Sequence, residues 1–118
     1  MRNFKELRIW QKGVNIAVDC FKLVKDFPND ERFGICRQIT KSGVSIPSNI
    51  AEGSSRKSEK DYARFIEISL GSSFELETQL IISQLAELGN QDLIKSIMVE
   101  VIDEQKMISG FYDTLDKG

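Results

Sequence analysis

The chain has no histidine, and only two cysteines and two prolines among its 118 residues. Histidine is the commonest general base and metal ligand, so its absence removes most catalytic constellations and the Glu-x-x-His pairs of a ferritin-like di-iron site. Cys20 and Cys36 are too few for a structural zinc site. Each lies among apolar residues of a helical pattern, which predicts two reduced core thiols in a cytoplasmic protein, with a disulfide as the alternative.

Long apolar runs are also missing. No stretch approaches the roughly 20 residues that span a bilayer, and the first six residues lead into an amphipathic pattern without a signal-peptide core. We therefore expect a cytoplasmic protein with no membrane partner. The hydrophobic content of 41% and charged content of 29% are ordinary for a globular protein, and a chain of this length fits one domain, residues 1–118, with a single core.

No segment alternates as a half-buried strand does, whereas apolar residues recur every three or four positions in four stretches. This pattern predicts helices over about 4–26, 31–53, 58–88 and from 93 onward. Short connections force neighbouring helices to be antiparallel, so we expect an all-α, up-down-up-down four-helix bundle. The expected core stripes are Leu7, Trp10, Val14, Ala17, Phe21 and Val24; Cys36, Ile39, Gly43, Ile46 and Ile50; Tyr62, Phe65, Ile66, Ser69, Ser73, Leu76 and Leu80; and Ile94, Ile97, Met98, Val101, Gln105, Ile108, Tyr112 and Leu115.

A proline interrupts the second of these helices. Pro47 removes a backbone donor and crowds the carbonyl four residues earlier, so we expect a kinked helix that ends at Gly53, with two short helices as the alternative. The next helix carries a run of small residues between Ser69 and Ser73. Such residues let a neighbouring backbone approach closely, and we expect that approach at the level of Pro47.

Short polar side chains surround this proline. Ser45, Ser48, Asn49 and Glu52 share the face opposite the apolar stripe. An ordinary solvated surface is one interpretation. The other is a structural hydrogen-bonded network, because serine and asparagine are poor helix formers but can bond to freed carbonyls. The candidate structural polar motif comprises Ser45, Pro47, Ser48, Asn49, Glu52 and, on the third helix, Glu75.

Charge is distributed unevenly along the chain. Residues 1–64 contain 13 Lys and Arg against 8 Asp and Glu, whereas residues 65–118 contain 3 against 10. The basic residues form one strip on the first helix and another on the third, and both strips, with Arg2, are expected to converge at one end of the bundle. The acidic tail, Asp113 and Asp116, is expected there too. The candidate nucleic-acid-binding residues are Lys5, Arg8, Lys12, Arg56, Lys57, Lys60 and Arg64, although a charge run is often only a solvated face.

No motif for catalysis or for a cofactor is present. The segment 53–58 lacks the glycine and lysine spacing of a phosphate-binding loop. Glu75 and Glu77 are two residues apart on a helix, so they point to different faces and cannot act as a carboxylate pair. We therefore expect a protein that is not an enzyme, with no catalytic residue, metal or cofactor.

Several of these motifs together resemble one protein family. The segments 7–12, 38–39, 44–53, 71–72 and 75–80, above all the run Ser-Ile-Pro-Ser-Asn-Ile-Ala-Glu-Gly, are similar to those of bacterial ribosomal-RNA intervening-sequence proteins, and to accessory proteins of diversity-generating retroelements. The resemblance covers nearly the whole chain. It implies a left-handed bundle that assembles into a ring-shaped homopentamer, nucleic-acid association in some members, and binding to a reverse transcriptase in the retroelement branch. It also favours the hydrogen-bonded network. One departure is Thr40-Lys41, where such proteins often carry two adjacent basic residues.

Self-association also has support from the residues themselves. Five apolar residues of the third helix fall off its core stripe, and a helix that is apolar on several sides is buried on several sides. They are Ile68, Leu70, Ile81, Ile82 and Leu85. Two functions therefore remain: an oligomer that binds RNA or DNA weakly through its basic end, or an adaptor that binds a protein partner and no nucleic acid.

Overall fold

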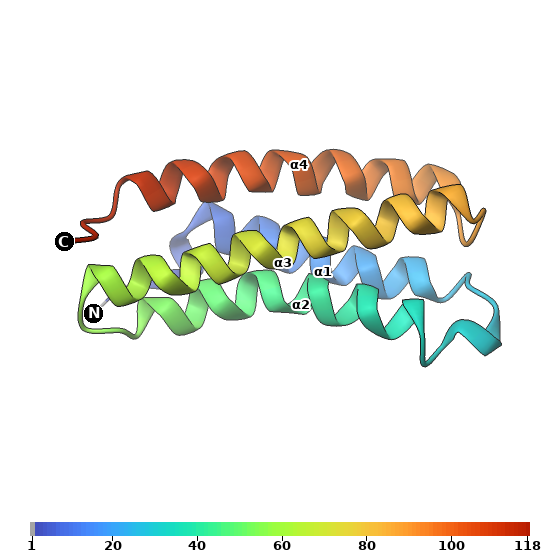
Figure 1. Cartoon of the computed structure of the whole chain (residues 1–118), viewed down its shortest axis with the longest axis horizontal. Coiled ribbons are helices and arrows are strands. Elements are labelled where there is room, and N and C mark those ends of the chain that lie inside the picture. The colour runs from blue at the N-terminus through green and yellow to red at the C-terminus, as the bar shows by residue number, and fades with distance from the viewer. Residues whose placement is uncertain (1) are drawn as a thin grey trace.

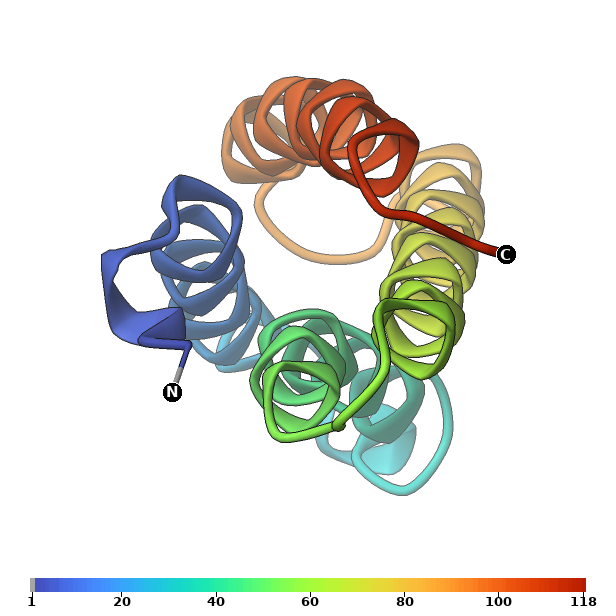
Figure 2. The same cartoon turned by 90° about the vertical axis from the view of Figure 1, so that its left-hand side faces the viewer.

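The computed structural model describes residues 2–118 and confirms the four-helix bundle. Its helices are α1 (Arg8–Val24), α2 (Ile35–Ser54), α3 (Glu59–Leu85) and α4 (Gln91–Asp113), with short 3-10 turns η1 (Phe4–Glu6) and η2 (Asn29–Glu31) and no strand in the described chain. The helices run up, down, up and down along a long axis of 46 Å (Figure 1). Viewed along that axis, α1 lies diagonally opposite α3, and α2 opposite α4 (Figure 2).

Two helices begin later than the sequence pattern predicts. Leu7 has an extended backbone, with φ −74° and ψ 129°, so it separates the turn η1 from α1. The Phe4 ring then packs edge-on against Trp10, with centroids 5.3 Å apart. The second helix begins at Ile35 instead of near Glu31, because η2 occupies that position and Gly34 takes the non-helical values φ −100° and ψ −111°.

Capping explains both ends of α3. The sequence Ser58-Glu59-Lys60-Asp61 matches a capping box, which predicts that Ser58 caps this helix. Its hydroxyl accepts a hydrogen bond from the Asp61 amide at 3.1 Å, as that pattern predicts. The helix ends at Leu85, three residues early, because Glu87 takes a left-handed φ of 59°. The amides of Glu87 and Leu88 then bond back to the carbonyls of Gln84 and Ser83, which is a Schellman ending formed without glycine.

The core contains most of the predicted residues of α2, α3 and α4, but only part of the predicted stripe of α1. Ala17 is buried, and Leu7, Trp10 and Val24 pack against the core from its edge. Phe21 is 52% exposed, whereas Ile16, Cys20 and Leu23 are buried. Close approach to α2 selects this register, because a Cβ on Gly43 would lie 3.0 Å from the Cys20 sulfur. The buried residues of α1 are Ile9, Gly13, Ile16, Ala17, Cys20 and Leu23.

The helix α2 passes unbroken through Pro47, which rules out two separate helices. It ends one residue beyond Gly53, and Gly53 keeps a helical backbone instead of a left-handed cap. Glycine fits this position because α2 and α3 come very close here. A Cβ on residue 53 would lie only 2.7 Å from the Phe65 Cβ of α3. Within residues 2–118, no helix combines the length and the apolarity that crossing a membrane requires.

Candidate functional site

The Pro47 segment is joined to α3 by side-chain hydrogen bonds. The hydroxyl of Ser69, which is fully buried, donates to the Ile46 carbonyl at 2.8 Å. The Ser45 and Ser72 hydroxyls are 2.7 Å apart and share one hydrogen bond. The small residues of α3 therefore approach α2 at the level of Pro47, as their run predicts.

Asn49 completes this connection from within α2. Its side-chain amide donates to the Ser45 carbonyl at 2.8 Å and to the Ser45 hydroxyl at 2.9 Å. The carbonyl that loses its partner to Pro47 is that of Gly43, four residues earlier. The polar side chains thus bond to the carbonyls of residues 45 and 46, and not to the freed one.

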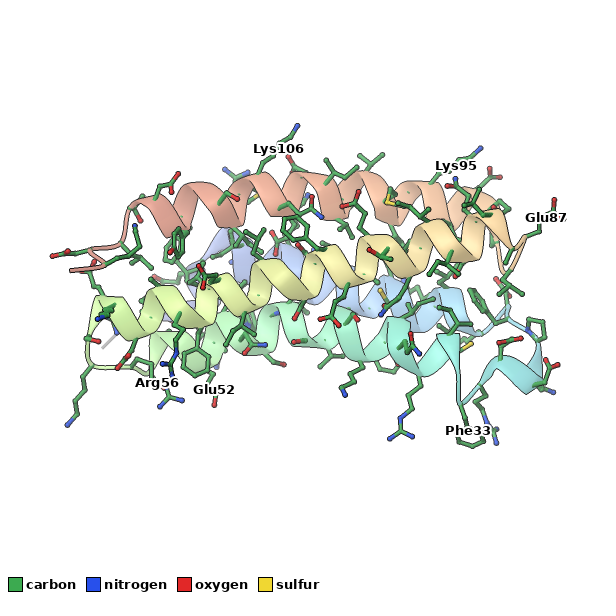
Figure 3. All side chains as sticks on the ribbon, viewed as in Figure 1. Phe33, Glu52, Arg56, Glu87, Lys95 and Lys106 are labelled. Carbon is green, nitrogen blue, oxygen red and sulfur yellow. The ribbon has the colours of Figure 1, made fainter. Side chains whose placement is uncertain are left out.

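The remaining members of the predicted polar motif lie outside this network. Ser48 and Glu75 are exposed, and neither side chain makes a hydrogen bond within residues 2–118. Glu52 is also exposed and lies 3.4 Å from the Arg56 guanidinium, one turn further along (Figure 3). The network is therefore a partly buried structural joint, and Glu52 belongs with the basic end of the bundle.

The basic end is built around the connection between α2 and α3. The Arg2 guanidinium donates to the carbonyls of Ser54 and Arg56 and lies 4.7 Å above the Tyr62 ring. Arg56 lies 4.5 Å above the Phe65 ring. A hollow of about 620 Å³ opens here, and its lining contains cations and hydroxyls without a carboxylate: Arg2, Ser54, Ser55, Arg56 and Lys57. Lys60 and Arg64 follow on the exposed side of α3.

The strip on α1 begins at the same end of the bundle as the start of α3. Lys5, in η1 beside α2, and Arg8, the first residue of α1, are exposed, while α1 itself lies diagonally opposite α3 (Figure 2). Lys12 is only 20% exposed and forms ion pairs with Glu100 and with Asp103 of α4, the latter at 3.0 Å. The hydrogen bond to Glu100 is the main cause that raises the pKa of Lys12. Lys12 therefore belongs to the α1–α4 contact and not to the basic end.

The C-terminal segment lies against the same end, as its position in the bundle predicts. The Asp116 amide donates to a Glu59 carboxylate oxygen at 2.8 Å, next to the start of α3. Asp113 is the last residue of α4 and is exposed. Negative charge therefore borders the basic end on its α4 side.

A buried glutamate is the feature that sequence reasoning missed. Glu104 is 0% exposed, and neither of its carboxylate oxygens has a hydrogen-bond partner. Burial raises the pKa of Glu104 to about 8, with Lys12 lowering it and Asp103 raising it. Its position between Val101 and Ile108, at core spacing, is the signal that could have revealed it. The site as a whole offers surfaces for binding. Within residues 2–118, no group of three or more His, Cys, Asp or Glu side chains is placed to hold a metal ion.

Several apolar side chains remain exposed along α3, as its off-stripe residues predict. Ile68 is 46%, Ile82 50% and Leu85 79% exposed. Phe74 and Ile81 are exposed on the same helix, whereas Leu70 is half-buried and packs against the core.

Comparison with known proteins identifies one family. The family model described as 23S rRNA-intervening sequence protein matches residues 5–110. A solved structure is similar: a protein with unknown function from the S23 ribosomal protein family of Bacteroides thetaiotaomicron VPI-5482. The TM-score is 0.80 at 24% identity, over 90% of this chain and 99% of that one, which shows the same fold. Neither description is that of an enzyme, and no curated protein matches the chain.

Proposed function

The chain belongs to the 23S rRNA-intervening sequence protein family, and we propose that it is a non-enzymatic homo-oligomer that binds RNA or DNA weakly through the basic end. The observation that carries this proposal is the hollow at the connection from α2 to α3, which is lined by three cations and two serines. Phosphate oxygens are the ligands that such a lining suits, because guanidinium and ammonium groups bind them by charge-assisted hydrogen bonds. Binding through phosphates does not depend on base sequence.

Assembly is the second part of the proposal. The exposed apolar side chains of α3 support it, because exposed apolar surface is typical of protein interfaces. A basic first half and an acidic second half suit a contact between unlike surfaces, which closes into a ring. A ring of five is what the resemblance implies. A ring would repeat the basic end about its axis, and linked sites strengthen weak binding.

A mobility-shift titration with a structured RNA and a duplex DNA tests the nucleic-acid part. We expect binding that weakens steeply between roughly 50 and 200 mM salt, since phosphate contacts release counterions. Reversal of Lys57, Lys60 and Arg64 to glutamate should abolish the shift. The matched control reverses three exposed lysines that lie away from the basic end, Lys25, Lys41 and Lys95, and should retain it.

Light scattering of the same samples tests assembly. We expect an oligomer for the wild type and for both variants, and a monomer at tens of micromolar would exclude the assembly.

The exposed apolar side chains of α3 equally suit a second function, that of an adaptor that binds another protein, such as a reverse transcriptase. Absence of any shift at low salt, with the oligomer intact, would favour the adaptor.

A further inference from the structure

We propose that Glu104 is a proton-operated latch: the core holds it as the neutral acid, and its ionisation opens the seam between α1 and α4. The side chain is 0% exposed and both of its oxygens lack a partner. A carboxylate buried without partners is strongly disfavoured, whereas a neutral carboxyl costs far less to bury. The folded bundle therefore favours the protonated form.

Glycine makes room for the carboxyl group. A Cβ on Gly13 of α1 would lie 3.1 Å from Glu104 Oε2, and 3.3 Å from both Ile46 Cγ2 and Pro47 Cβ of α2. The carboxyl therefore lies over the Gly13 backbone, close to the apolar side chains of α2. An ionised group in this position has the Gly13 backbone and two hydrocarbon side chains as neighbours instead of water.

The charged groups around Glu104 are few. On α1 the cation is Lys12, which Glu100 and Asp103 of α4 already engage. The neighbours on α2, Ile46 and Pro47, carry no charge. On α3 the buried residues Ser69, Ser73 and Leu76 are also uncharged. Glu77 of α3 accepts a hydrogen bond from Gln105, the neighbour of Glu104 in α4.

The seam between α1 and α4 is the route by which water would reach the ionised group. A hollow of about 620 Å³ runs along it, lined only by residues of these two helices, among them Lys12, Ile16, Asp103 and Met107. No loop joins α1 directly to α4, since the chain passes through α2 and α3 between them. The two helices can therefore separate without straining a loop, and only side-chain contacts such as the Lys12 ion pairs have to break. On ionisation the proton passes to solvent, and Lys12 must leave Glu100 or Asp103 in order to pair with the new carboxylate.

The sign of the pH response follows from proton binding. The folded state holds the Glu104 proton up to about pH 8, whereas the unfolded chain releases it near the ordinary glutamate value of 4.5. The folded state is therefore stabilised by its tighter hold on this proton. That stabilisation is fully present below pH 4.5 and is lost as the pH rises toward 8. Between these values the unfolding equilibrium constant should rise up to about tenfold per pH unit, and by up to about three thousandfold in all.

Two measurements test the latch. Carbon-13 NMR of the labelled carboxyl groups should show one glutamate that titrates near pH 8, and that signal should vanish in Glu104→Gln. Denaturation from pH 5 to 9 should show the loss of stability in the wild type and in Glu75→Gln, an exposed control, and little of it in Glu104→Gln. If that variant fails to fold, Glu104→Leu takes its place. A Glu104 carboxyl that titrates near 4.5 would overturn the proposal.

Hydrogen exchange locates the opening. After correction for intrinsic rates, amides of α1 and α4 should lose more protection between pH 6 and 9 than those of α2 and α3, whose protection falls only as far as the global stability does. Glu104→Gln should remove this difference. An equal loss over all four helices would show that ionisation destabilises the whole bundle, and would overturn the assignment to this seam.

Discussion

Gly53→Ala is the substitution for which helix propensity and packing predict opposite effects on the stability of the folded protein. Alanine in place of glycine inside a helix normally stabilises by about 1 kcal/mol, because glycine loses more backbone entropy on folding. Gly53 lies inside α2 with a helical backbone, so propensity alone predicts a gain.

The packing around Gly53 predicts a larger loss. A Cβ there would lie 2.7 Å from Phe65 Cβ, 3.0 Å from Tyr62 Cδ1 and 3.3 Å from the Tyr62 carbonyl oxygen. Carbon atoms pack best at about 3.5–4.0 Å. The Phe65 Cβ is attached directly to its backbone, so a rotamer change cannot relieve the contact and α3 must shift away from α2. Overpacking of this kind costs about 1–3 kcal/mol, which leaves a net destabilisation of about 1 kcal/mol.

Gly110→Ala is the matched control. Gly110 lies inside α4, is exposed, and has no atom within 4 Å of the position a Cβ would take. We expect this variant to be about 0.5–1 kcal/mol more stable than the wild type. Thermal denaturation, followed by circular dichroism at one protein concentration, measures both effects. The melting temperature should be ~4 °C lower for Gly53→Ala than for the wild type, and higher for the control. If Gly53→Ala stabilises as much as Gly110→Ala, the close approach of α2 and α3 is refuted.

Two further substitutions test the core and the polar joint. Leu76→Ala should cost about 2–5 kcal/mol in chemical denaturation, because Leu76 is fully buried and truncation leaves a cavity; a cost below about 0.5 kcal/mol, the range of surface substitutions, would place Leu76 outside the core. Ser69→Ala should cost about 0.5–1.5 kcal/mol through the lost bond to the Ile46 carbonyl, whereas Ser48→Ala, at an exposed position, should change stability by less than about 0.5 kcal/mol. Equal effects of the two serine variants would contradict a structural role for the joint.

The elements that local chemistry determines could be predicted from the sequence. Four amphipathic patterns, short connections and the Ser58 cap all act within a few residues, and the bundle follows from them. The α1 register could not be predicted in this way. That helix has apolar residues on two flanks, one with Phe21 and the other with Ile16 and Cys20. Only the approach of Gly43 decides which flank is buried, and the sequence pattern of α1 contains no information about that contact.

Glu104 could not be predicted for a different reason. Its spacing places it on the core face of α4, which predicts burial. An ionised glutamate is almost never buried without a partner, so the residue type predicts exposure instead. The conflict disappears if the group is neutral. Its protonation depends on Gly13 and on the hydrocarbon of α2, which belong to distant parts of the chain.

The basic end shows how topology limits a surface that composition predicts. Chain order correctly places the N-termini of α1 and α3 at the same end, but in an up-down-up-down bundle these helices are diagonal (Figure 2). Lys12 is engaged by α4, and Lys5 and Arg8 lie on the α1 corner. On the α3 corner the exposed cations are Lys57, Lys60 and Arg64. With Arg2 and Arg56 of the hollow, one protomer offers five phosphate contacts at most, which give a slope of about −4.5 for log affinity against log salt. A steeper slope than this would therefore mean that several protomers bind one nucleic acid together, and would connect binding to assembly.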